Sequence, residues 1–192
     1  MVCDDLLFSP LSNFSANRYP TTVPHHHRRI PMSDILILTT GGTIDKVYFD
    51  ALSEFQVGDT MVHRLMELGL VKHDVRVQEI CRKDSLELDD ADRAALRHAV
   101  ESAPETRIVI THGTDTMTDT AAVLKNIPAK TICMLGALSP ARFAESDASF
   151  NLAMAFGVVQ SAQPGIYIAM NGTVFDANKV RKDRSIGAFV AQ

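Results

Sequence analysis

Apolar runs alternate with amphipathic segments along most of the chain, which is the pattern of a fold built from alternating strands and helices. Short apolar or alternating runs bounded by polar turns predict strands at 35–38, 75–81, 107–110, 131–135, 166–170 and 173–175. Apolar residues at helical spacing predict helices at 58–70, 88–102, 116–124 and 147–160. The alternation indicates right-handed βαβ crossovers. We therefore predict an α/β fold: an open, mainly parallel sheet with helices on both faces, a three-layer arrangement of the flavodoxin or Rossmann type.

The first 31 residues do not follow this pattern. They contain scattered prolines, serines and asparagines, and the run His25-His26-His27-Arg28-Arg29. This histidine run has no companion ligands, so we predict no metal site there. No sustained apolar segment of the kind found in a secretory signal is present. We expect an irregular or disordered tail over residues 1–31, and a single domain over residues 32–192.

Composition excludes several classes of function. The net charge of −4 is spread without a long run of one sign, which argues against a nucleic-acid partner. The longest apolar stretches are shorter than the ~20 residues that a membrane span needs. Cys3, Cys81 and Cys133 are odd in number and have no metal-ligand spacing, so we expect free thiols and a cytoplasmic protein.

The candidate chemistry lies in two turns, TGGTID at residues 40–45 and THGTDTM at residues 111–117. Each turn follows a predicted buried strand, and so places threonine hydroxyls at the carboxyl end of that strand. In an open α/β sheet this rim is where ligands bind. The first turn lacks the glycine spacing of the known phosphate-binding loops, so nucleotide binding is a weaker alternative, and a plain structural turn is another.

We interpret Thr43 as a candidate nucleophile. A threonine hydroxyl reacts poorly near neutral pH unless a base or a cation–carboxylate pair handles its proton. Thr114 and Asp115 provide part of such a group. His112 is the obvious base by residue type, but we expect it to be structural and oriented by hydrogen bonds.

The two turns together resemble the signature motifs of the bacterial-type L-asparaginases. The resemblance continues through DSLEL at 84–88, GALSP at 136–140, FN at 150–151 and MNGTV at 170–174, and it extends from residue 34 to about residue 184. It implies a domain equivalent to the N-terminal domain of asparaginases. It further implies hydrolysis of L-asparagine to L-aspartate and ammonia through a threonine nucleophile and an acyl-enzyme. The resemblance implies no metal or organic cofactor. It does imply a homodimer or a higher homo-oligomer.

The resemblance also assigns roles residue by residue. Thr43 matches the family nucleophile, and Thr114, Asp115 and Lys182 match the second catalytic triad. Ser85 matches the serine that holds the substrate carboxylate, and Asp115 would also hold its ammonium group. The substrate-binding turns themselves contain Gly42 and Gly113. Which of the two threonines attacks first stays open.

Three departures from the family pattern affect these expectations. Phe55 stands where the family usually has a tyrosine, and Tyr48 in the same loop is a candidate replacement, with a packing role as the alternative. Leu86 replaces a polar residue of larger members. The chain also resembles the short, single-domain asparaginases, which lack the C-terminal domain that completes a neighbour's site. Fewer ammonium contacts imply weaker substrate binding and a higher KM.

Two other functions remain as alternatives. One is a catalytically inactive amino-acid-binding protein on the same scaffold. The other is the glutamine-using subunit of an amidotransferase. For assembly, the apolar residues Phe150, Met154 and Phe156 of the predicted 147–160 helix exceed what one sheet face needs. They are consistent with a core role and with a homo-oligomer.

Overall fold

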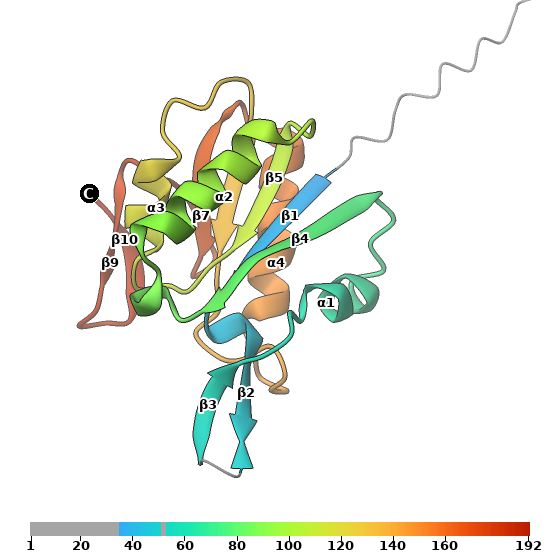
Figure 1. Ribbon diagram of the computed structural model, residues 1–192, viewed down its shortest axis with the longest axis vertical. Coiled ribbons are helices and arrows are strands. Elements are labelled where there is room, and N and C mark those ends of the chain that lie inside the picture. Colours follow the sequence, from blue (N-terminus) through green and yellow to red (C-terminus); the bar gives the residue numbers. More distant parts are fainter. Residues whose placement is uncertain (1–34, 51–52) are drawn as a thin grey trace, which may run out of the picture.

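The computed structural model describes residues 35–50 and 53–192, and the predicted tail over residues 1–31 lies outside this range. Its centre is a six-stranded sheet with the order β4-β1-β5-β6-β7-β8 (Figure 1). The first five strands pair in parallel and β8 pairs antiparallel with β7. The bounds are β1 Ile35–Gly41, β4 Val75–Lys83, β5 Arg107–Thr111, β6 Thr131–Leu135, β7 Gly165–Met170 and β8 Thr173–Asp176. The predicted open, mainly parallel sheet is confirmed, and its parallel strands have the order of the flavodoxin type.

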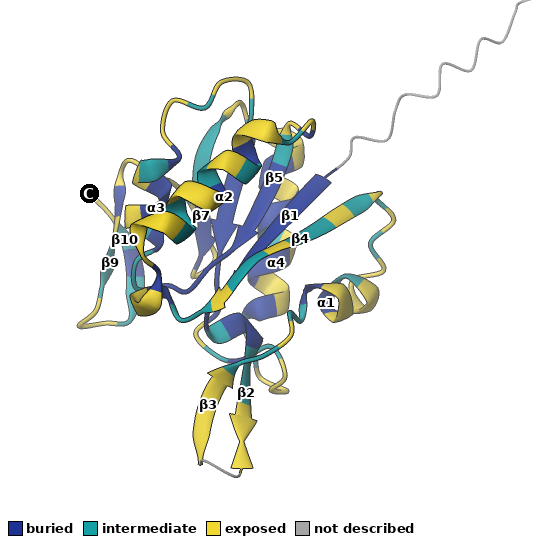
Figure 2. Ribbon diagram, viewed as in Figure 1, coloured by how far each residue is buried: buried dark blue, intermediate teal, exposed yellow. Residues whose placement is uncertain are grey.

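Helices cover both faces of the sheet, as predicted (Figure 1). On β1, Ile35 and Ile37 point into the core beneath one pair of helices, whereas Leu36 and Leu38 point into the core beneath the other pair. The central strands are fully buried (Figure 2), because strands covered on both faces must be apolar on both faces. The first pair is α1 (Val62–Leu68) and α4 (Ala148–Ser161), and the second is α2 (Asp90–Ser102) and α3 (Met117–Val123).

Two antiparallel hairpins were not predicted. One joins β2 (Lys46–Phe49) to β3 (Glu54–Val57), and it projects from the body of the domain with most of its residues exposed (Figures 1 and 2). The other joins β9 (Val180–Asp183) to β10 (Ala188–Ala191). Val180 and Phe189 of this second hairpin are buried in the core on the α2–α3 side, which fixes it to the domain.

Within the described residues, two short 3₁₀ turns follow strands of the central sheet. The turn η1 (Thr43–Asp45) follows β1, and the turn η3 (Ser85–Glu87) follows β4. In η3, the Asp84 side chain accepts a hydrogen bond from the Leu86 N–H, and Glu87 reaches back to the Asp84 N–H, which makes a capping box. Both turns therefore lie at the carboxyl rim of the sheet.

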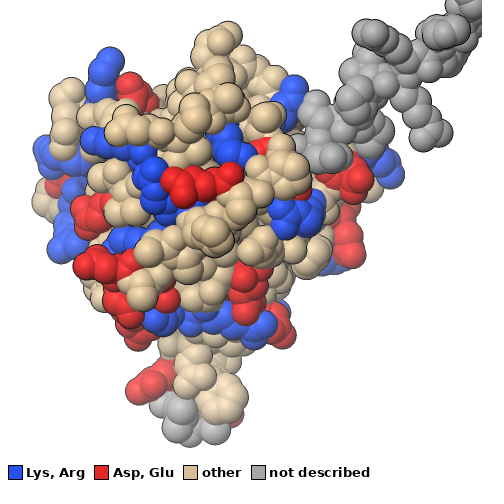
Figure 3. Space-filling view, turned by 45° about the horizontal axis from the view of Figure 1, so that its top comes forward, with Lys and Arg blue, Asp and Glu red and all other residues tan. Residues whose placement is uncertain are grey.

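The surface carries mixed charge. On the face drawn in Figure 3, basic and acidic side chains alternate, whereas the projection formed by β2 and β3 is largely uncharged. Within residues 35–50 and 53–192, no helix has the length and apolar character needed to cross a membrane.

Candidate active site

The crevice of the sheet lies between β1 and β5. From β1 the chain runs to β4 on one side, and it then returns to β5 on the other side, so the loops after β1 and β5 diverge at this point. Ligands of open α/β sheets bind at such a switch point, outside the carboxyl ends of the strands. The two threonine-bearing turns are the two loops that flank it.

The glycines hold these loops in contact. Gly42 has a φ of 85°, and a Cβ atom placed on it would lie 2.5 Å from the Cα and N atoms of Gly113. A Cβ atom on Gly113 would in turn lie 2.6 Å from the Ser85 Cβ atom. Only glycine fits at both positions, because any side chain would separate the backbones. The residues that precede Thr43 and Thr114 are therefore packed against each other.

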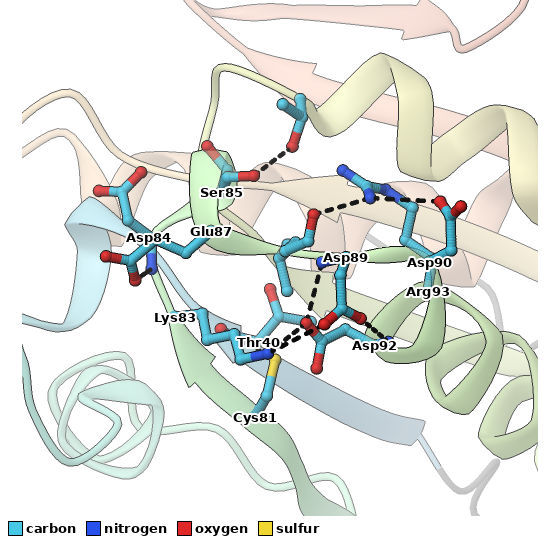
Figure 4. A network of polar contacts seen from close by, with 12 residues as sticks. Thr40, Cys81, Lys83, Asp84, Ser85, Glu87, Asp89, Asp90, Asp92 and Arg93 are labelled. Carbon is cyan, nitrogen blue, oxygen red and sulfur yellow. Dashed lines mark hydrogen bonds and ion pairs between the residues drawn. The ribbon is translucent and has the colours of Figure 1, made fainter.

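Ser85 is fixed beneath the second turn. Its Oγ atom accepts a hydrogen bond from the Asp115 N–H at 3.3 Å, and its carbonyl accepts one from the Thr116 hydroxyl at 2.7 Å. Figure 4 shows the polar contacts around Ser85 and the residues that flank it in the chain. In this network the Lys83 ammonium lies 2.6 Å from an Asp92 carboxylate oxygen. The structure thus brings Ser85, Gly113 and Asp115 together.

Lys182 reaches the same point from the β9–β10 hairpin. Its Nζ atom donates to the Thr114 hydroxyl at 2.6 Å and to the Asp115 carboxylate at 2.7 Å. Its side chain is only 13% exposed, and Phe189 is its register partner on β10. The hairpin that carries Lys182 is anchored in the core, so the ammonium group is held against Thr114 by the fold.

A second cation near Asp115 was missed by sequence reasoning. The Arg184 Nε atom lies 3.8 Å from the Asp115 oxygen that binds Lys182, although the arginine side chain is 68% exposed. Arg184 lies in the turn between two short strands, where no sequence periodicity shows which way a side chain points. Asp115 therefore lies between one partly buried and one exposed positive charge.

Thr43 lies in a more open part of the site. It is half-buried, and it lines an apolar pocket of about 330 Å³ together with Lys46, Phe55, Leu138, Ser139, Pro140 and Phe143. A polar cleft of about 700 Å³ adjoins this pocket and contains Asp115, Asp84, Leu86, Arg82 and Glu54. Lys46 and Phe55 line both spaces.

Tyr48 lies on the hairpin outside both of these spaces. Its ring packs edge to face on Phe55 with the ring centroids 5.4 Å apart, and 48% of the residue is exposed. Phe55, rather than Tyr48, lines the pocket with Thr43. The observed contact is a packing contact, and a catalytic role for Tyr48 stays a prediction.

His112 is completely buried and hydrogen-bonded. Its Nδ1 atom lies 2.7 Å from the Gly113 carbonyl oxygen, and its Nε2 atom lies 2.8 Å from the Thr120 hydroxyl oxygen. Burial lowers its pKa to about 4, so the ring is neutral near neutral pH. This geometry agrees with the structural role that we expected for His112.

The two described cysteines are unsuited to nucleophilic chemistry. Burial raises the pKa of Cys81 to about 11 and that of Cys133 to about 12, so both stay protonated thiols at neutral pH. Both are free thiols. Among the described residues, no group of three histidine, cysteine, aspartate or glutamate side chains is placed to hold a metal ion.

Asp45 is a second residue that sequence reasoning missed. It is 1% exposed and accepts a hydrogen bond from the Met61 N–H at 2.8 Å, which ties the Thr43 turn to the start of α1. Burial raises the pKa of its carboxyl group to about 6. The position follows Thr43 in the first motif, but its burial depends on α1 and is not visible in the local sequence.

This fold and site define a class: α/β domains whose switch point carries threonine hydroxyls, an ammonium group and a carboxylate. A protein-family model, described as "Asparaginase, N-terminal", matches residues 34–190. The chain belongs to the asparaginase family.

Individual relatives support the same family assignment. The chain is 30% identical over 166 residues to an L-asparaginase of Thermococcus kodakarensis, which covers 80% of this chain and 48% of that protein. It is 31% identical over 164 residues to L-asparaginase 2 of Escherichia coli, covering 80% and 47%. A solved structure of the thermostable T. kodakarensis L-asparaginase superposes with a TM-score of 0.71 at 29% identity, covering 82% of this chain and 51% of that chain. This chain spans about half the length of these relatives.

Proposed function

We propose that this chain hydrolyses the side-chain amide of L-asparagine to L-aspartate and ammonia through a threonine nucleophile. One observation carries the proposal: a single partly buried ammonium group, that of Lys182, contacts both the Thr114 hydroxyl and the Asp115 carboxylate, in the loop whose Gly113 packs against Gly42 of the Thr43 turn. The names of the relatives, L-asparaginases, support amide hydrolysis as the class of reaction.

Substrate binding is assigned to the second turn and its neighbours. The Asp115 carboxylate faces the polar cleft and offers a negative charge to the α-ammonium group of an amino acid. The family motif assigns the α-carboxylate to Ser85, whose hydroxyl accepts a hydrogen bond from the Asp115 N–H and which is 1% exposed. With both ends held there, the side-chain amide extends toward the first turn, where Thr43 lies.

The reaction then proceeds in two steps. The Thr43 oxygen bonds to the amide carbon, the C–N bond breaks, and the leaving nitrogen takes the proton that the Thr43 hydroxyl gives up, so that ammonia is released. Water next attacks the resulting β-aspartyl ester, which frees aspartate and restores the Thr43 hydroxyl. Thr114, Lys182 and Asp115 form the relay that handles protons, in which Asp115 orients the lysine and Lys182 polarises the Thr114 hydroxyl.

A homodimer or higher homo-oligomer remains part of the proposal. Phe150 of α4 is 60% exposed, and no charged residue occurs in α4, both of which suit a face that pairs with another copy. Light scattering of the full chain at several concentrations tests this directly. A monomer at all concentrations contradicts it.

A second candidate is use of glutamine as an ammonia source. It is favoured by a relative from Methanococcus vannielii that is named as a subunit of glutamyl-tRNA(Gln) amidotransferase. The two chains are 27% identical over 180 residues, which covers 88% of this chain and 41% of that protein. An inactive amino-acid-binding protein is the third candidate.

Ammonia release from asparagine and glutamine separates these three functions. We expect turnover of asparagine with the higher kcat/KM, lost by about 10³-fold or more in Thr43→Ala and retained in part by Thr43→Ser, which keeps the hydroxyl. Higher kcat/KM for glutamine favours the amidotransferase. Calorimetric binding of asparagine without ammonia release identifies the binding protein.

A further inference from the structure

Two spaces of different character share the side chains of Lys46 and Phe55, and Thr43 lines the smaller of them. We call the smaller one the substituent pocket; it is lined by Thr43, Lys46, Phe55, Leu138, Ser139, Pro140 and Phe143. The larger is the polar cleft, which contains Asp115 and shares Lys46 and Phe55 with the substituent pocket. A molecule held on Asp115 in the polar cleft and extended past Phe55 therefore enters the substituent pocket.

The substituent pocket presents apolar surface to solvent. Phe55, Leu138 and Phe143 are 49%, 50% and 47% exposed, and the Phe55 and Phe143 rings meet edge to face with centroids 6.1 Å apart. Clustered exposed apolar side chains beside a reactive group are typical of a ligand-binding surface.

One wall of the substituent pocket is held by hydrogen bonds from its backbone N–H groups. The Ala141 N–H donates to the Ile44 carbonyl oxygen at 3.0 Å, which joins the loop of Pro140 and Phe143 to the Thr43 turn. The Leu138 and Ser139 N–H groups donate to one Asp147 carboxylate oxygen at 2.9 and 3.1 Å. The wall formed by residues 138–143 is therefore fixed to the Thr43 turn and to Asp147 before a ligand arrives, whereas the hairpin contributes Lys46 and Phe55.

Hydrolysis of asparagine makes no use of such a pocket. Its leaving group is ammonia, which is small and polar, whereas the substituent pocket has two phenyl rings, a leucine and a proline in its walls. With the amide carbon at Thr43 and the amino-acid end on Asp115, the amide oxygen and nitrogen both project away from Asp115, so the orientation with the nitrogen toward the substituent pocket is part of the inference. A group attached to that nitrogen would meet the apolar walls.

We propose that this site also hydrolyses secondary amides, namely L-asparagines that carry an apolar or aromatic group on the side-chain nitrogen. The inference rests on the proposed function, since it uses the same nucleophile and the same amino-acid contacts. The Thr43 oxygen bonds to the amide carbon, the C–N bond breaks, and the nitrogen takes a proton and leaves as a primary amine. Water then cleaves the ester to give aspartate, so one water is consumed for each amine released.

The test compares L-asparagine with N4-benzyl-L-asparagine on the full chain. We expect release of benzylamine with a kcat/KM within about tenfold of that for ammonia release from asparagine, because the benzyl group makes apolar contacts with the walls of the substituent pocket. Phe143→Ala should lower the ratio of the benzyl to the asparagine kcat/KM by about tenfold or more. Phe49→Ala is the matched control, since Phe49 is also 47% exposed but lines neither space, and it should leave the ratio unchanged.

The outcomes separate this proposal from the proposed function. Turnover of asparagine with no turnover of the benzyl compound overturns the pocket and leaves the function standing, as does an equal effect of Phe143→Ala on both substrates. If neither compound is hydrolysed, calorimetric binding of the two compounds tests the substituent pocket by itself. Hydrolysis of secondary amides then fails together with the proposed function; tighter binding of the benzyl compound that is lost in Phe143→Ala shows only that the substituent pocket binds an apolar group, and equal or absent binding overturns the pocket as well.

Discussion

The two halves of the site differ in how firmly the fold holds them. After β5, the Thr114 hydroxyl and the Asp115 carboxylate are bonded to Lys182, whose side chain is 13% exposed. After β1, Thr43 is half-buried at the base of a hairpin that projects into solvent. Proton transfer requires fixed distances between donor and acceptor, whereas substrate must enter and leave. The rigid half therefore suits proton handling, and the open half suits attack on a substrate.

The largest expected effect comes from breaking the rigid half. Lys182→Met removes the ammonium group but keeps a long apolar side chain, and we expect kcat for asparagine to fall by about 10²–10⁴-fold. The measurement is steady-state ammonia release at saturating asparagine.

Arg184→Met is the matched control for Lys182→Met. Arg184 approaches the same Asp115 oxygen at 3.8 Å, but its side chain is 68% exposed. A solvent-exposed ion pair contributes little, so we expect a change in kcat of a few-fold at most. Equal losses in the two variants would show that general positive charge, rather than the buried relay, is what matters.

Substitution of Gly42 tests the contact between the Thr43 turn and the Thr114 turn. Gly42→Ala should destabilise the fold by about 3 kcal/mol or more, because its Cβ atom would lie 2.5 Å from the Gly113 backbone and its φ is 85°. Gly157→Ala is the control, since a Cβ atom there meets nothing within 4 Å, and in a helix it should stabilise by up to about 1 kcal/mol. Urea denaturation measures both. A neutral Gly42→Ala would mean that the two loops are not in contact.

The open half carries a charge that weakens the fold at neutral pH. The pKa of Asp45 rises from its ordinary 3.8 to about 6 in the folded chain, so the folded state favours the protonated form. Its stabilising contribution is complete below pH 3.8 and is lost as the pH rises through 6, a change of up to about 3 kcal/mol.

Asp45→Asn tests this linkage, since the amide oxygen still accepts the Met61 N–H. We expect the variant to be more stable than the parent chain at pH 7, with the difference shrinking toward pH 4. Thermal unfolding across this pH range measures it. A difference that does not vary with pH would mean that Asp45 is not buried in its charged form.

The smallest expected effect concerns the hairpin. Tyr48→Phe removes the hydroxyl group but keeps the ring that packs on Phe55. A packing role therefore predicts a change in kcat of less than about twofold. Phe55→Tyr is the companion variant, because it restores a hydroxyl at a position that lines the pocket with Thr43. A loss of tenfold or more in Tyr48→Phe would instead support the catalytic role predicted for this tyrosine.

Much of the fold could be predicted because buried strands are apolar on both faces. The run Ile35 to Leu38 can only lie in a covered sheet, and the motifs that follow such runs must lie at the carboxyl rim. The hairpins were missed for the opposite reason. Residues 46–49 and 180–183 mix charged and apolar side chains over four positions each, which is too short for a period to be visible.

The site could be predicted in part for a related reason. Thr43, Thr114 and Asp115 lie in motifs with a recognisable order, but Lys182 was assigned only by resemblance to a family. Its approach to Thr114 depends on Phe189 and Val180 entering the core, a contact between distant segments. Burial of Asp45 likewise depends on α1, so its raised pKa has no local signal.

The most direct measurement is to find the ester itself. The chain is mixed with excess L-asparagine, quenched in acid at successive times, digested and analysed by peptide mass spectrometry. We predict a β-aspartyl adduct on the peptide that contains Thr43, present in the parent chain and absent in Thr43→Ala. Turnover accompanied by an adduct on Thr114 alone would contradict the assignment of Thr43 as the nucleophile.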